Sequence, residues 1–202
     1  SSAAADYVNR ALDILEWYSL HRNEIDWPRF RNAALADADA ATTIEDTYPA
    51  LRAAVKRLGD GHSSFVTAAQ MEEHERSFAL NPTMSTGQRL AGPIGYLQIP
   101  SFAGAQPEPA SRFAQQTQDL IKDIDGNDLA GWVVDLRQNV GGNMWPMFAG
   151  LGPLLGDGKL GAFVFPDGRT QEWFYRGGAA GFDGEHVLPP PRNRLDLYST
   201  RV

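Results

Sequence analysis

The stretch Gly131-Trp-Val-Val-Asp-Leu136 constrains the fold of this chain more than any other segment. It is a short, continuously apolar run, which is typical of a β-strand covered by helices on both faces. A strand-like segment at 94–100 and a helix-periodic segment at 108–124 precede it. Strand, helix and buried strand in this order predict a βαβ unit with parallel strands and a right-handed crossover. We therefore expect an α/β fold.

A glycine-rich loop, 137–143, follows this strand and leads into a helix expected over 144–155 and closed by Gly156. Ligand sites in open α/β sheets lie at the carboxyl ends of strands, and the first turn of a helix has unpaired N–H groups. Gly141 and Gly142 would let such groups approach an oxyanion closely. The same glycines also fit a tight strand-to-helix turn without any binding role, so the residues alone leave both interpretations open.

The rest of the second half is predicted to be β-structure and loop. Two strands are expected at 160–165 and 170–175, joined by a β-turn at Pro166-Asp-Gly-Arg169. The Gly- and Pro-rich segment 176–193 is expected to be a mobile loop. The polar segment 66–92 shows too little periodicity for an assignment.

The first 58 residues have helical periodicity and predict three helices. One buried stripe is expected on the first helix, formed by Val8, Ala11, Leu12, Leu15 and Tyr18. Asp26 before Trp27-Pro28 marks the start of the second helix, and Thr43 with Asp46 resembles a capping box for the third. We expect two domains: a helical subdomain at 1–65 and an α/β core at 66–202.

Composition excludes several classes of function. A net charge of −7 argues against nucleic acid as a partner, because phosphate binding needs a basic face. No window approaches the ~18 apolar residues of a membrane span. The chain has no cysteine, and the glycine loop matches no nucleotide-binding motif, so neither a metal nor another cofactor is expected. No signal peptide is visible, so it is absent or already removed.

His62 is a second candidate functional residue. It lies between glycines in Gly59-Asp-Gly-His-Ser-Ser64, directly after the third predicted helix. Histidine is the usual general base near neutral pH, and loop residues often carry function. A surface or helix-capping histidine fits the same position. No other histidine or carboxylate stands at zinc-ligand spacing from it.

Several motifs together resemble the tail-specific (C-terminal processing) serine peptidase family. Leu58–Phe65 resembles the family's L-G-D-G-H-S segment, and Val134–Gly142 resembles its D-L-R-x-N-x-G-G loop. Gly95–Ile99 fits the strand that opens the family's core. The pieces match in order and spacing over roughly residues 7–175.

The resemblance implies a crotonase- or ClpP-like α/β core with an N-terminal helical subdomain. By resemblance, Gly141 and Gly142 line the oxyanion hole, and Asn139 and Asn143 of the same loop bind the substrate. Family members use either a Ser–Lys dyad, usually with a PDZ module, or a serine supported by histidine, as in the tricorn core. Residues 63–93 leave too little room for a PDZ fold, which favours the second group with His62 as general base.

The resemblance places the nucleophilic serine after a further strand, and therefore beyond Val202. Ser199 lacks the strand-then-helix setting of an exposed nucleophile, and Ser63 and Ser64 are too close to His62 in sequence. We expect a serine peptidase acting on peptides or proteins in its complete form, with the isolated chain inactive.

The nucleophile would come from a missing segment or from a complementing second chain. An extracytoplasmic or secreted location is implied by resemblance, with a cytoplasmic one left open. Two rival interpretations remain: a non-catalytic ligand- or protein-binding module on the same scaffold, and a structural fragment whose unpaired strand edge drives homo-oligomerisation.

Overall fold

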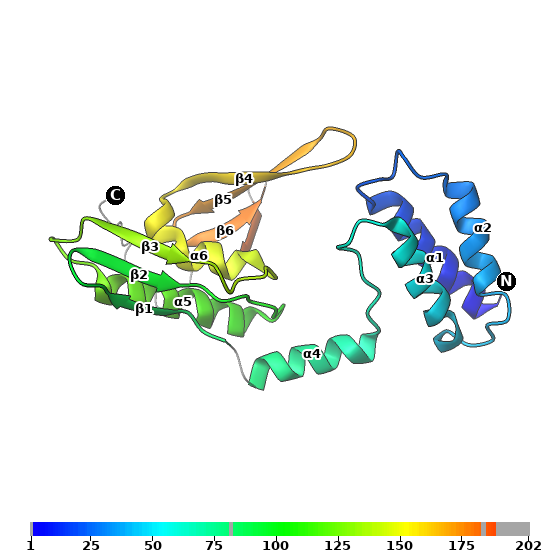
Figure 1. The fold of residues 1–202 in the computed structure, drawn as a ribbon, viewed down its shortest axis with the longest axis horizontal. Coiled ribbons are helices and arrows are strands. Elements are labelled where there is room, and N and C mark those ends of the chain that lie inside the picture. The colour runs from blue at the N-terminus through cyan, green and yellow to red at the C-terminus, as the bar shows by residue number, and fades with distance from the viewer. Residues whose placement is uncertain (1, 81–82, 183–184, 189–202) are drawn as a thin grey trace. The chain divides into compact units, whose positions relative to one another are not determined.

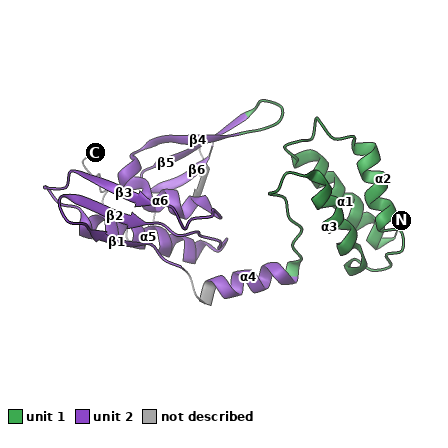
Figure 2. Cartoon of the chain, viewed as in Figure 1, with its two compact units in different colours: residues 1–68, 164–169 green, residues 69–163, 170–202 purple. Residues whose placement is uncertain are grey.

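The computed structural model describes residues 2–80, 83–182 and 185–188. The chain divides into two compact units, one of residues 1–68 with 164–169 and one of residues 69–163 with 170–202 (Figure 2). The first is helical and the second mixes helices with β-sheet (Figure 1). The predicted α/β fold with an N-terminal helical part is therefore confirmed, whereas the domain boundary at residue 65 stays a prediction.

The helical unit contains the three predicted helices. They are α1 (Ala3–Tyr18), α2 (Trp27–Asp37) and α3 (Tyr48–Leu58), with a short 3-10 turn at Glu45–Thr47 before α3. The start of α2 is capped by the Asp26 side chain, which accepts a hydrogen bond from the Arg29 N–H at 3.1 Å. The third helix ends at Gly59, whose φ of 72° is a left-handed conformation that glycine adopts without strain.

One apolar cluster holds these helices together. Its buried members are Val8, Leu12, Trp27, Phe30, Ala34, Leu51, Ala54 and Leu58. Tyr18 was predicted to belong to the buried stripe, and this is wrong, because its exposed fraction is 70%. At about 100° per residue, Tyr18 stands well off the direction of Val8 and Leu12.

The capping box predicted from Thr43 and Asp46 is present. The Thr43 N–H donates to Asp46 Oδ2 at 2.9 Å, and the Asp46 N–H donates to Thr43 Oγ1 at 3.2 Å. Hydrogen bonds from the Thr43 and Thr42 N–H groups lower the pKa of Asp46 to about 2. The box opens the 3-10 turn that leads into α3.

The second unit contains two sheets. The first has the strand order β1 (Thr86–Arg89), β2 (Ile94–Gln98) and β3 (Gly131–Asp135). Strand β1 is antiparallel to β2, and β2 is parallel to β3. The second sheet has the order β4 (Gly158–Val164), β5 (Thr170–Arg176), β6 (Ala179–Phe182) and β7 (Glu185–Leu188).

Two helices, α5 (Pro107–Ile124) and α6 (Met144–Leu155), pack on each other between these sheets. Helix α5 joins β2 to β3, which completes the predicted βαβ unit, and packs on β1 and β2. Helix α6 packs on the second sheet. The core between them includes Leu97, Ile99, Phe102, Phe113, Ile121 and Met147.

Residues 66–92, which were left without an assignment, hold helix α4 (Ala68–Leu80) and strand β1. Two expectations need correction. The segment 176–193 was predicted as a loop, but its described part forms β6 and β7, and residues 189–193 lie outside the described residues. Strand β3 is not buried on both faces: Val133 and Val134 are 46% and 37% exposed, since α5 packs on β1 and β2 instead.

No helix in the part of the chain that the structure describes is both long enough and apolar enough to cross a bilayer.

Candidate active site

The carboxyl end of β3 is organised around Asp135, a buried carboxylate. Its oxygens accept hydrogen bonds from the Tyr96 hydroxyl at 2.6 Å and from Arg137 Nη2 at 2.7 Å. The Arg137 N–H also donates to it at 3.0 Å. The Arg137 contacts, followed by the Tyr96 hydroxyl, hold the pKa of Asp135 well below its ordinary value, and the hydrogen bond to this carboxylate raises the pKa of Tyr96. The first residues of the loop are thus anchored to the sheet.

Asn139 fixes the middle of the loop with both ends of its side-chain amide. Its Nδ2 donates to the Pro100 and Ile99 carbonyl oxygens at 3.1 and 3.3 Å, and contacts Met147 Sδ at 3.0 Å. Its Oδ1 accepts the Gly141 N–H at 2.8 Å. The Asn139 side chain therefore ties the loop to the segment that follows β2.

Ser101 and Phe102 hold the next part of the loop. The Val140 N–H donates to Ser101 Oγ at 2.7 Å, and the Asn143 N–H donates to the Phe102 carbonyl oxygen at 2.6 Å. Phe102 and Gly142 form a parallel β-bridge. A Cβ added at Gly142 would collide with the Phe102 carbonyl oxygen, so this close approach requires glycine.

Asn143 begins α6. Its Oδ1 accepts the Trp145 N–H at 3.2 Å, and its Nδ2 donates to the Gly104 carbonyl oxygen at 2.9 Å. The two asparagines predicted to bind the substrate, Asn139 and Asn143, thus both make hydrogen bonds within the protein.

The predicted oxyanion glycines differ in what their N–H groups do. Gly141 and Gly142 have φ values of 102° and 115°, which favour glycine. The Gly141 N–H is engaged by Asn139, whereas the Gly142 N–H donates to no acceptor among the residues described. The loop therefore presents the Gly142 N–H as an available donor, next to the start of a helix whose dipole favours negative charge.

His62 lies in an exposed turn of the helical unit. Asp60 Oδ1 accepts the N–H groups of His62 and Ser63 at 2.9 and 2.8 Å, and Oδ2 accepts the Ser63 hydroxyl at 2.5 Å. These bonds, with the Ser63 hydroxyl first, lower the pKa of Asp60 to about 2. The turn fixes the His62 backbone, and the residue is exposed. His62 belongs to one compact unit and the glycine loop to the other.

The serines considered as nucleophiles have different surroundings. The Ser63 hydroxyl donates to the Asp60 carboxylate and not to the ring of His62, the predicted general base. Ser199 lies outside the described residues.

The sequence did not identify Tyr96, Ser101 and Phe102 as parts of the site. Ser101 follows directly after the strand-like segment 94–100, so its place at a strand's carboxyl end was a usable signal. Phe102 contributes a backbone oxygen, and no residue type reveals such a role.

Comparison with known proteins agrees with this geometry. Residues 93–190 match the model of peptidase family S41, a range that includes β2, α5, β3 and the whole glycine loop. The chain is 30% identical over 158 residues to the nisin-resistance protein of Lactococcus lactis subsp. lactis, an alignment covering 78% of this chain and 47% of that protein. The chain thus spans about half the length of this curated relative.

A solved structure, that of a lipoprotein from Streptococcus agalactiae, shares the fold with a TM-score of 0.72 and 21% identity. It aligns over 85% of this chain and 58% of its own length. The resemblance that the sequence motifs indicated is therefore confirmed by the match of residues 93–190 to peptidase family S41.

Proposed function

We propose that this chain is part of a serine-type peptidase that works through an acyl-enzyme, with a nucleophilic serine outside these 202 residues. The observation that carries the proposal is the unengaged Gly142 N–H in a rigidly held loop, inside the region that matches a peptidase family. A fixed N–H donor at the start of a helix suits the oxyanion of a tetrahedral intermediate.

In this proposal each residue has a separate role in catalysis. The external serine attacks the peptide carbonyl, and His62 takes its proton and later gives it to the leaving amine. The Gly142 N–H stabilises the negative oxygen, while Gly141, whose own N–H is held by Asn139, shapes the loop beside it. Asn139 and Asn143 hold the loop in shape and border the substrate. The core is of the crotonase or ClpP type, in the group without a PDZ module, and it acts near protein C-termini.

An extracytoplasmic location belongs to the same proposal. It is supported by what the relatives are: one is a nisin-resistance protein and one a lipoprotein.

A fluorophosphonate probe, applied to the natural full-length protein, tests the nucleophile. Covalent labelling of one serine that lies beyond residue 202 is expected, together with cleavage of an internally quenched peptide. The His62→Ala variant is expected to lose cleavage by a factor of about 10² or more while its thermal unfolding stays unchanged. His21→Ala, in the same unit, is the control and should keep full activity.

Gly142 itself is a poor test site, because any side chain there meets the Phe102 backbone and disturbs the fold. Failure of the probe to label the protein, with no peptide turnover, would rule out the peptidase proposal and favour a non-catalytic binding module. Full activity in His62→Ala would leave a serine peptidase but remove histidine as its base.

A further inference from the structure

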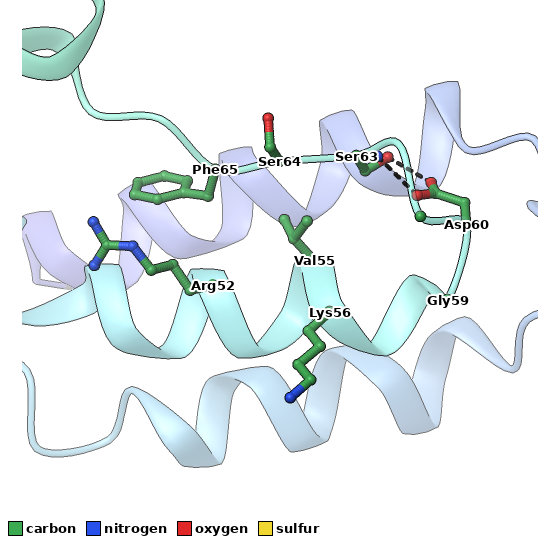
Figure 3. Close-up of a pocket in the computed structure, with 9 residues that line it drawn as sticks. Arg52, Val55, Lys56, Gly59, Asp60, Ser63, Ser64 and Phe65 are labelled. Atoms are coloured by element: carbon green, nitrogen blue, oxygen red, sulfur yellow. Dashed lines mark hydrogen bonds between the residues drawn. The ribbon is translucent and has the colours of Figure 1, made fainter.

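A pocket lies directly beside His62 in the helical unit. It is lined by α3 and by the turn that follows it, with Gly61 and Ser63, the two sequence neighbours of His62, in its wall (Figure 3). Its volume is about 470 Å³. This volume falls within the range of about 300–1,000 Å³ that is usual for ligand pockets.

Arg52 gives the pocket a fixed positive charge. Its guanidinium lies 5.6 Å from the centre of the Phe65 ring, a cation–π contact that orients the planar group (Figure 3). Arg52 forms no salt bridge with any carboxylate of the described residues, unlike Arg57 on the same helix, which pairs with Asp37. An oriented guanidinium without a carboxylate partner is a ready site for a carboxylate ligand.

The other charges at the pocket do not cancel this one. Lys56, one turn further along α3, adds a second positive charge, although its side chain extends away from the turn (Figure 3). Asp60 is the one carboxylate among the lining residues, and both its oxygens already accept hydrogen bonds from His62 and Ser63. The lining therefore combines two cations with one internally satisfied anion.

Between these charges the pocket has an apolar surface, formed by Val55 and the Phe65 ring (Figure 3). We propose that this pocket is a substrate subsite that binds a peptide carboxylate on Arg52 and the adjoining aliphatic groups against Val55 and Phe65. The inference rests on the proposed function in one respect: a peptide anchored here would lie next to His62, the proposed general base. The carboxylate can be a C-terminal one or that of an acidic side chain.

Fluorescence anisotropy with the 202-residue chain tests the binding directly, without turnover. The probe is a fluorescein-labelled hexapeptide, Ala-Ala-Gly-Ala-Leu-Val, with a free C-terminus. It is compared with its C-terminal amide and with an amide that carries Glu in place of Leu. The free acid should bind about tenfold more tightly than the plain amide, which is the effect of one charge-assisted hydrogen bond. Tight binding of the Glu peptide would assign the site to acidic side chains, and weak binding would assign it to C-termini.

Single substitutions then show which side chain causes the difference in affinity between the free acid and the amide. Arg52→Gln should abolish the difference between free acid and amide, Arg52→Lys should keep part of it, and Lys56→Gln should reduce it by less than Arg52→Gln does. Arg10→Gln removes the same charge from the same unit outside the pocket and should change nothing; circular dichroism verifies that each variant is folded. Equal affinity for all three peptides, or an equal loss in Arg10→Gln, overturns the proposal.

Different results would reject the peptidase proposal and the Arg52 subsite proposal. His62→Ala should leave peptide affinity unchanged while it removes cleavage in the full-length protein. Carboxylate-dependent binding on Arg52 without any cleavage would keep the subsite and reject the peptidase. Cleavage with no preference for a carboxylate and no effect of Arg52→Gln would keep the peptidase and reject the subsite.

Discussion

Asn139 shows at the residue scale how one side chain can set the shape of a whole loop. Replacing it with alanine leaves the Gly141 N–H without its acceptor and the Pro100 carbonyl without its donor. We expect Asn139→Ala to lower the free energy of unfolding by about 1–3 kcal/mol, the usual cost of unpaired polar groups. Urea unfolding followed by circular dichroism measures it.

Gln138→Ala is the matched control, because Gln138 is exposed and adjacent in sequence; its effect should stay within about 0.5 kcal/mol. Unchanged stability in Asn139→Ala, with weaker peptide binding, would instead mean that this side chain faces the substrate.

Tyr96 offers a prediction about pH. Arg137 and the Tyr96 hydroxyl lower the pKa of Asp135, so the stability they confer is present above the ordinary aspartate pKa of about 3.9 and is lost as the pH falls through the lowered value. Tyr96→Phe removes one of these donors and moves the pKa of Asp135 back up. Acid unfolding, followed by circular dichroism, should begin at a higher pH in this variant. Tyr18→Phe, at an exposed tyrosine, should unfold as the unaltered protein does.

At the scale of elements, α6 reverses the usual effect of glycine in a helix. Gly→Ala inside a helix ordinarily stabilises by up to about 1 kcal/mol. A Cβ at Gly152, however, would overlap the Tyr175 ring of β5. We expect Gly152→Ala to destabilise by about 1–3 kcal/mol through overpacking, measured as a lower midpoint of urea unfolding. Gly131→Ala is the control, since nothing lies within 4 Å of a Cβ there; a stabilised Gly152→Ala would contradict the packing argument.

Elements with strong periodicity or clear caps were predictable from the sequence. Helix α6 spans the predicted residues and ends at Gly156, and α5 begins one residue before the predicted start. Elements that depend on distant partners were not. Helix α4 has no apolar stripe and leaves Met71 47% exposed. It contacts the core through Phe78, whose ring packs edge-on against the Phe102 ring with the two ring centres 4.7 Å apart.

Strands β1 and β6 escaped prediction for a similar reason. Strand β1 reads Thr-Gly-Gln-Arg and is held by its pairing with β2 rather than by strand propensity. In β6 the small residues Ala179 and Ala180 are fully buried, so a segment that looks like a flexible loop is in fact tightly packed.

The position of the site was predictable from the sequence, but the hydrogen bonds that shape its loop were not. A strand end, a glycine pair and a helix start are visible in the sequence at 131–144. That Asn139 and Ser101 take up the N–H groups of Gly141 and Val140 depends on a second segment brought close by the βαβ topology. Sequence spacing cannot show which of several loop N–H groups remains available.

At the scale of the whole molecule, the exposed side of β3 affects how the chain behaves in solution. Val133, Val134 and Leu136 are 46%, 37% and 52% exposed, and in the described part of the chain β3 pairs with β2 alone. Apolar strand edges of this kind promote association. We expect the isolated chain to self-associate with increasing concentration, and Val133→Lys with Val134→Lys to shift it toward monomer in analytical ultracentrifugation. Val66→Lys, at a valine 45% exposed in the helical unit, should not; a chain that stays monomeric throughout would contradict the expectation.

The anchoring of the glycine loop to the residues after β2 matters for protein engineering. Because Ile99, Pro100, Ser101 and Phe102 supply the acceptors that shape residues 139–143, the two segments form one transferable part. Grafting the glycine loop alone into a related scaffold would transfer its amino-acid sequence but not its conformation. A chimera that exchanges both segments together is the smallest exchange that should preserve it.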